Sequence, residues 1–178
     1  MPGPHDAASD GTIEVCRTYL TMDSPDALRP GRTPALPLEV ARVQCDPAGY
    51  RRLYRAVGEQ WHWHDRDAWS DEQLAAHLAR PEVGVWVARV EGRTAGFFEL
   101  EHHADGSVEI AYFGLTPAYL GQGLGGALLT RAVREAWALG ATRVWLHTCT
   151  LDAPQALPNY LARGFRVERE ERYTTTLG

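Results

Sequence analysis

The chain has 178 residues, of which 44% are hydrophobic and 23% charged, and its formal net charge is −5. This length and composition are typical of one globular domain with a sizeable core. The charge leaves no basic footprint for nucleic acid, and no apolar run approaches the roughly 20 residues of a membrane span. We therefore expect neither a nucleic-acid partner nor a membrane partner, while the acidic balance mildly favours a cationic acceptor.

Three cysteines, Cys16, Cys45 and Cys149, occur without a CxxC pair. An odd, unpaired set argues against a disulfide framework and against a structural zinc site, so we expect a cytoplasmic protein and no metal. Residues 1–11 lack the pattern of a signal peptide and are expected to be a disordered lead-in. Residues 12–178 are expected to form a single domain.

In chain order, β-branched and aromatic residues first predict a strand over 12–22. A proline-rich connector leads to a second strand over 38–44. An Asp-Pro pair then starts a helix over 46–61, and a serine cap followed by acidic residues starts another over 70–81.

The second half alternates strands and helices. Strands over 83–90 and 93–103 are separated only by Glu91 and Gly92, which is a hairpin signal. The remaining predicted elements are a strand over 107–115, a helix from the glycine stretch to Trp137, a strand over 141–150, a helix over 154–165 and a strand over 166–176. This order predicts a mixed α/β fold with one late βαβ crossover.

The stretch YLGQGLGGALL, Tyr119 to Leu129, contains four glycines within six residues and opens a helix. Read literally, Gly121, Gly123 and Gly126 satisfy the dinucleotide pattern GxGxxG. That interpretation requires a βαβ unit near the start of a larger domain, and too little chain follows to supply its second half. Exposed amides at a helix N-terminus would instead bind the pyrophosphate of another nucleotide, unless the glycines only make a flexible loop.

The segments LTPAYLGQGLGGALL and ALPNYLARGF, with the strand before them, resemble the GNAT superfamily of acetyl-CoA-dependent N-acyltransferases. The resemblance covers about residues 83–170. It implies a GNAT fold, with a mostly antiparallel sheet of six or seven strands flanked by helices. The strand over 12–22 would be an addition to the minimal fold. Leu120 and Ala153 depart from the family pattern, which has Arg or Gln and Asn there.

By this resemblance, the glycine stretch would hold acetyl-CoA. The backbone of the strand before it would pair with the pantetheine arm, and the Leu115 amide would polarise the thioester carbonyl. The implied cofactor-binding residues are Phe113, Leu115, Gln122, Gly123, Leu124, Gly125 and Gly126.

Two residues are candidates for proton transfer. Tyr160, in the family pattern YxxxGF, would protonate the departing CoA thiolate, although it could simply pack on the sheet. Glu109 lies six residues before Leu115 and would deprotonate the acceptor amine, with Phe113 and Leu115 expected on the same strand face. The alternative for Glu109 is a cross-strand pair. Glu99 and Glu101 are rivals for the base role or for binding a cationic substrate. Cys149 could carry the acetyl group covalently, but no base is placed beside it.

The acceptor site is expected at EQWHWHDRDAW, between the first two helices. Trp61 and Trp63 would contact the substrate unless they belong to the core, and Glu99 could bind a cationic acceptor. The histidines of this stretch lack a third metal ligand, and His103 is expected to face solvent.

The sequence thus predicts direct transfer of acetyl from acetyl-CoA to a primary amine of a small molecule, or of a protein or peptide. The alternative is an acyl-CoA-binding module without catalysis. The N-terminal strand could extend the sheet edge, cap the active site or form a homodimer contact.

Overall fold

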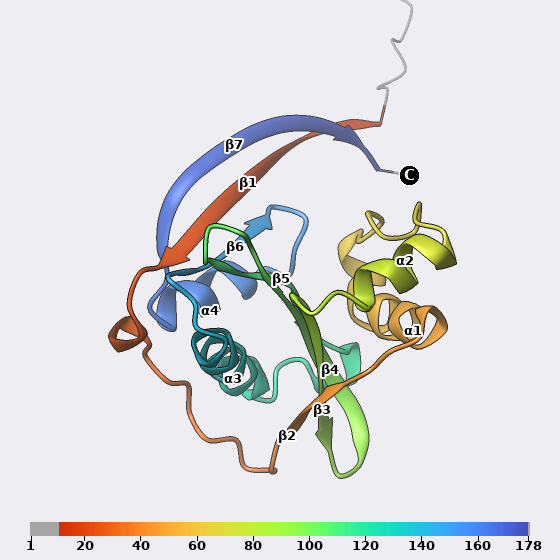
Figure 1. Cartoon of the computed structure of the whole chain (residues 1–178). Coiled ribbons are helices and arrows are strands. Elements are labelled where there is room, and N and C mark those ends of the chain that lie inside the picture. Colours follow the sequence, from red (N-terminus) through yellow and green to blue (C-terminus); the bar gives the residue numbers. More distant parts are fainter. Residues whose placement is uncertain (1–10, 178) are drawn as a thin grey trace, which may run out of the picture.

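The computed structural model describes residues 11–177 (Figure 1). The expected lead-in therefore lies almost wholly outside the described residues. Seven strands form one sheet in the order β2-β3-β4-β5-β6-β1-β7, antiparallel except between β5 and β6. Their bounds are β1 Thr12–Met22, β2 Glu39–Val43, β3 Val83–Val90, β4 Arg93–His102, β5 Val108–Leu115, β6 Val144–Cys149 and β7 Arg166–Thr176.

Four helices cover the two faces of this sheet, and three short 3₁₀ turns lie in the connections between elements. The helices are α1 Pro47–Gly58, α2 Asp71–Leu78, α3 Leu124–Ala138 and α4 Ala156–Ala162, and the turns are η1 Pro25–Ala27, η2 Glu59–Trp61 and η3 Pro117–Tyr119. The predicted strands and helices are therefore all present. Among the described residues, no helix has the length and apolarity needed to cross a membrane.

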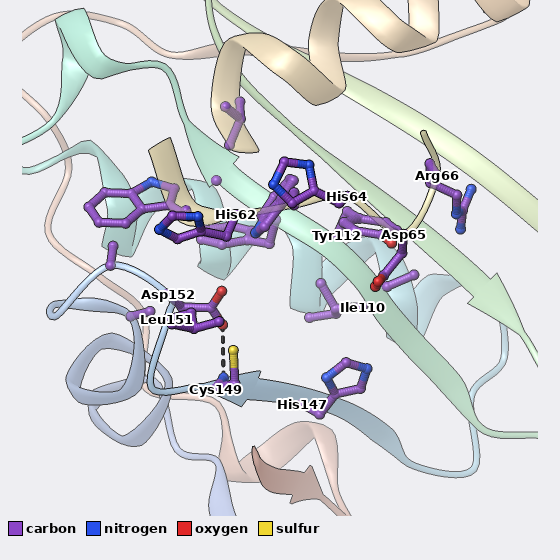
Figure 2. A pocket seen from close by; sticks show the side chains of 18 of the residues that line it. His62, His64, Asp65, Arg66, Ile110, Tyr112, His147, Cys149, Leu151 and Asp152 are labelled. Atoms are coloured by element: carbon purple, nitrogen blue, oxygen red, sulfur yellow. Dashed lines mark hydrogen bonds between the residues drawn. The ribbon is translucent and has the colours of Figure 1, made fainter. Parts of the chain in front are cut away.

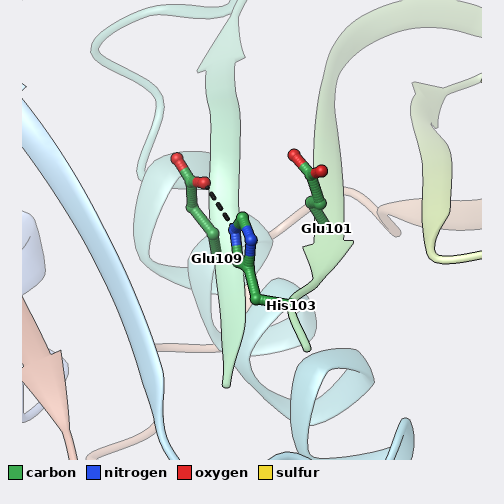
Figure 3. A group of neighbouring side chains, drawn as sticks. All are labelled: Glu101, His103 and Glu109. Atoms are coloured by element: carbon green, nitrogen blue, oxygen red, sulfur yellow. Dashed lines mark hydrogen bonds and ion pairs between the residues drawn. The ribbon is translucent and has the colours of Figure 1, made fainter. Parts of the chain in front are cut away.

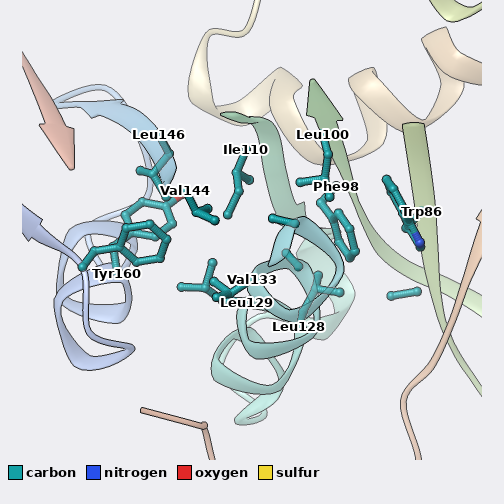
Figure 4. Packing of buried hydrophobic residues seen from close by; sticks show 14 of the residues in the cluster. Trp86, Phe98, Leu100, Ile110, Leu128, Leu129, Val133, Val144, Leu146 and Tyr160 are labelled. Carbon is teal, nitrogen blue, oxygen red and sulfur yellow. The ribbon is translucent and has the colours of Figure 1, made fainter. Parts of the chain in front are cut away.

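Helices α3 and α4 lie on one face and α1 and α2 on the other (Figure 1). The apolar stripe of α3 places Leu128, Leu129 and Val133 against strand residues such as Leu100 in the larger core (Figure 4). A smaller aromatic core, around Tyr54, joins α1 to the opposite face. Each face of the sheet thus has its own packed core. A gap between two neighbouring strands would therefore open onto both faces.

The added strand β1 is not at the sheet edge. It is inserted between β6 and β7 and pairs antiparallel with both, from Arg17 opposite Cys149 to Thr12 opposite Thr176. Of the three alternatives for this strand, extension of the sheet edge is therefore excluded, because β7 takes that position.

Strands β5 and β6 are parallel but barely paired. Their ladder contains only Val108 opposite Val144 and Glu109 opposite Trp145. Beyond these two pairs the strands separate, so their carboxyl ends leave backbone groups that a ligand can pair with.

A register shift interrupts the pairing of β5 with β4. Glu99 faces Tyr112 and Leu100 faces Ile110, which leaves Ala111 as an extra residue. The bulge reverses the alternation, so Glu109 shares a face with Tyr112 and not with Phe113 or Leu115. The prediction that Glu109 lies on the face of those two residues is wrong for this reason.

Candidate active site

A cavity of about 770 Å³ lies where β5 and β6 separate. Its lining includes Tyr160 and Gly125 from the α3/α4 face and Tyr112 and Trp63 from the α1/α2 face. The cavity therefore passes through the sheet. Two ligands that enter from opposite faces would meet at the gap, which is the geometry needed for direct group transfer.

The side of the cavity predicted to bind acetyl-CoA includes the start of α3. Gly121 and Gly123 both have φ of +75°, and Gly123 caps the helix without any side-chain hydrogen bond. A Cβ atom at either position would meet nothing within 4 Å, so the backbone conformation rather than packing requires glycine there. The amides of the first turn are consequently available to an anion.

This conformation leads to a prediction with an internal control. Gly123→Ala should raise the dissociation constant of acetyl-CoA about tenfold, because L residues disfavour this left-handed geometry by about 1–2 kcal/mol. Gly92→Ala, in the β3–β4 turn at φ +78° with open space around it, imposes the same backbone cost far from the cavity. Titration calorimetry should show weaker binding for the first variant only; equal affinities would contradict a role for the Gly123 turn.

The other predicted cofactor-binding residues fall into two groups, those that line the cavity and those whose side chains do not. Phe113, Leu115 and Gly125 line the cavity, together with Leu120 and Ala153, the two departures from the family pattern.

Three more of them face elsewhere. Leu124 is buried in the larger core, and the Gln122 amide donates to the Ala118 carbonyl at 2.9 Å. A Cβ on Gly126 would crowd Nη1 of Arg163, which is the end of a flexible side chain. A Cβ on Gly31 would lie 2.5 Å from the Gly126 carbonyl carbon, so close packing requires glycine at position 31. The side chains of these three positions do not line the cavity.

Tyr160 is 7% exposed and packs edge-on against Phe113 and Phe165, at ring-centroid distances of 6.1 and 6.3 Å. It lines the cavity on the α3/α4 side. Burial, with the charge of Asp152 nearby, raises the pKa of the phenol. Tyr160 therefore stays protonated at neutral pH and can act only as a proton donor there.

Glu109 lines the cavity on the opposite face. It lies close to Glu101 and His103, which are also residue types that can bind a metal ion (Figure 3). Its Oε1 atom lies 2.9 Å from Nε2 of His103, so His103 does not simply face solvent as expected. The donor atoms of Glu101, His103 and Glu109 lie within 4.8 Å of one another. Arg80 binds Glu101 at 2.8 Å, so each carboxylate already has a cationic or polar partner.

One wall of the cavity consists of η2 and the loop 62–70, which we call the acceptor loop after its predicted role (Figure 2). Trp61 and Trp63 line the cavity, and Trp63 also packs against Tyr54 and Tyr112 at 5.6 and 5.1 Å. Trp63 thus belongs to the smaller core, and its contact with a substrate stays a prediction. Asp65 points into the same cavity and makes no hydrogen bond or ion pair among residues 11–177.

The substrate role predicted for Glu99 is wrong, because its side chain is fully buried. The carboxylate binds Nη2 of Arg66 at 2.9 Å and Nε2 of His77 at 3.1 Å. Burial alone would raise the pKa of Glu99, but the His77 hydrogen bond and the Arg66 charge lower it, so Glu99 is ionised. Arg66 also lies over the ring of Trp69, at 4.3 Å. This cluster fixes the acceptor loop to β4.

The sequence did not predict two further lining residues, Arg17 of β1 and His147 of β6. Burial and the neighbouring Arg17 charge lower the pKa of His147, which keeps its imidazole neutral at pH 7. His147 lies two residues before Cys149 on the predicted strand and therefore shares its face, which was a usable signal. No sequence signal indicated Arg17, because its place in the cavity depends on the insertion of β1 between β6 and β7.

The chain belongs to the GNAT acetyltransferase family. A sequence model described as "Acetyltransferase (GNAT) family" matches residues 50–165, which include both catalytic candidates and the glycine turn.

Among curated relatives, a mycothiol acetyltransferase from Segniliparus rotundus is 30% identical over 173 residues, covering 91% of this chain and 64% of the relative. An uncharacterized N-acetyltransferase from Mycobacterium tuberculosis is 35% identical over 77 residues, covering 43% of this chain and 49% of the relative. The chain thus spans less than two thirds of the length of these relatives.

A solved GCN5-related N-acetyltransferase from Kribbella flavida has the same fold, with a TM-score of 0.63 at 22% identity. The match covers 92% of this chain and 59% of that structure.

Proposed function

We propose that residues 12–178 form a single cytoplasmic transferase domain that moves the acetyl group of acetyl-CoA directly to a primary amine of a small molecule. The observation that carries this proposal is the cavity through the sheet, with Tyr160 on one face and Glu109 on the other. Acetyl-CoA would enter from the α3/α4 face, and its pyrophosphate would bind the free amides after Gly123.

The acceptor amine would enter from the α1/α2 face, between the acceptor loop and β6. An alkylammonium has a pKa near 10, so a base must remove a proton before the nitrogen can attack. Glu109 takes this proton, directly or through water. The nitrogen then attacks the thioester carbonyl, which the Leu115 amide polarises, and the C–S bond breaks as Tyr160 protonates the thiolate. The nitrogen loses its second proton as the amide forms, and a proton transferred through water restores the Tyr160 phenol.

The alternative is an acyl-CoA-binding module without catalysis. Leu120 and Ala153 motivate it, since both line the cavity where the family pattern has polar side chains. A protein or peptide amine is the second choice of acceptor. The mycothiol acetyltransferase relative supports the first choice, because its name specifies a small-molecule acceptor.

Thermal unfolding with acetyl-CoA, CoA and NAD tests the cofactor assignment. Ligand at about 100 times its dissociation constant adds roughly 2.7 kcal/mol to the free energy of unfolding, which should raise the midpoint by about 5–10 °C. We expect this rise with acetyl-CoA and CoA and none with NAD. A rise with NAD alone would restore the dinucleotide interpretation, and no rise with any ligand would overturn the proposal.

A further inference from the structure

Three arginines line the cavity, and two of them are neutralised within the protein. Arg66 binds Glu99 at 2.9 Å, and Arg80 binds Glu101 at 2.8 Å. Arg17 differs: within residues 11–177 its guanidinium has no carboxylate within 4.0 Å. The surrounding strands partly desolvate this guanidinium, but its interactions with Tyr19 and Tyr173 raise its pKa, so Arg17 faces the cavity as a cation without an ion-pair partner among these residues.

The acidic residues nearest to Arg17 in the fold are engaged elsewhere. Asp152, which also lines the cavity, accepts hydrogen bonds from the Thr148 hydroxyl at 2.6 Å and the Cys149 amide at 2.9 Å. Glu171 is its cross-strand partner on β7, but the Glu171 carboxylate binds Arg169 and accepts a hydrogen bond from the Tyr19 hydroxyl at 3.3 Å. Arg17 itself lies over the ring of Tyr173, with its Cζ atom 5.0 Å from the ring centroid. The tyrosine restricts the guanidinium without neutralising it.

The position of Arg17 associates it with the acceptor rather than with acetyl-CoA. Leu20 and Met22 of β1 face the core under α3, so Arg17, an odd number of residues away, faces the α1/α2 side. It pairs with Cys149, the last residue of β6, which lines the cavity beyond the point where β5 and β6 separate. The phosphates of acetyl-CoA would lie on the other face, at the start of α3.

We propose that Arg17 binds an oxyanion on the acceptor, so that the substrate is a small primary amine that also carries a carboxylate or phosphate group. This inference rests on the proposed function and specifies its acceptor. A guanidinium offers two parallel N–H donors, which match the oxygens of either group. Glu109 and Asp65 line the same cavity and would face the ammonium group. The cavity thus offers both a cationic side chain and acidic side chains to one molecule.

The test compares amines that differ only in the oxyanion: phenylalanine with 2-phenylethylamine, 4-aminobutyrate with propylamine, and glucosamine 6-phosphate with glucosamine. CoA release from saturating acetyl-CoA is followed with a thiol reagent. In at least one pair, the oxyanion-bearing amine should have a kcat/KM about 10–100-fold higher, as expected for a charge-assisted hydrogen bond. Whether a carboxylate or a phosphate pair responds identifies the group.

Arg17→Gln should reduce this ratio to about one. Arg172→Gln is the matched control, because it removes a positive charge from the same β1–β7 ribbon but does not line the cavity. Equal responses to both members of every pair, including no turnover, would overturn the inference, as would a preference that survives Arg17→Gln. If acetyl-CoA still raises the unfolding midpoint, the proposed cofactor assignment stands and only this inference fails. If acetyl-CoA does not, both fall together.

Discussion

Tyr160→Phe should lower turnover of acetyl-CoA about 100-fold while leaving its dissociation constant unchanged. The substitution removes only the hydroxyl from a ring that stays packed between Phe113 and Phe165. Without a proton donor, the CoA thiolate must leave as an anion, and loss of a general acid typically costs 10²–10⁴-fold. CoA release measures turnover, with either a primary amine or water as the acceptor, and titration calorimetry measures binding.

Tyr119→Phe is the matched control for this prediction. Tyr119 belongs to η3 beside the glycine turn, but it does not line the cavity. Its turnover should stay within about twofold of the wild type. Turnover of Tyr160→Phe within threefold of the wild type would remove the acid role. If the wild type binds acetyl-CoA yet releases no CoA under any condition, the inactive binding module becomes the better interpretation.

Glu99→Gln should destabilise the protein by about 3–5 kcal/mol, because it leaves the buried Arg66 guanidinium without its counter-charge. The unfolding midpoint should fall by roughly 6–20 °C. Since the pKa of Glu99 is lowered in the fold, the stability it contributes is present above its unfolded pKa of about 4.3. The difference between variant and wild type should therefore narrow as the pH falls below that value.

Two comparisons show whether the charge itself matters. Glu135→Gln breaks an i,i+4 pair with Arg131 at the protein surface and should change stability by less than about 1 kcal/mol. The double variant Arg66→Met, Glu99→Leu removes both charges and should be more stable than Glu99→Gln alone. A Glu99→Gln midpoint within 2 °C of the wild type would contradict this account of the acceptor loop.

Local patterns predicted the elements well, because each depends on residues close together in sequence. The predicted strand over 12–22 agrees with β1, and the Ser70 cap indeed accepts a hydrogen bond from the Gln73 amide. The glycine turn was likewise predictable, since Gly121 and Gly123 adopt a backbone conformation that other residues disfavour.

The errors concern features that arise only when distant segments meet. The bulge at Ala111 depends on pairing with β4, and it places Glu109 on a face that alternation alone does not predict. Glu99 looked like a substrate ligand because its partners, Arg66 and His77, come from a loop and a helix more than 20 residues away. Arg17 was missed because its neighbours on β6 and β7 are more than 130 residues away.

The inserted strand β1 also has a consequence for biosynthesis. Strand β7 pairs only with β1, and β1 pairs only with β6 and β7, so the first described strand has no partner until β6 has been made. During synthesis, residues 12–22 therefore leave the ribosome with neither strand edge hydrogen-bonded to a partner. More than 120 further residues must be synthesised before β6 is available to pair with them. Such non-local pairing slows folding, and an unpaired strand favours aggregation. We expect production of this protein to depend on chaperones that bind the nascent N-terminal segment.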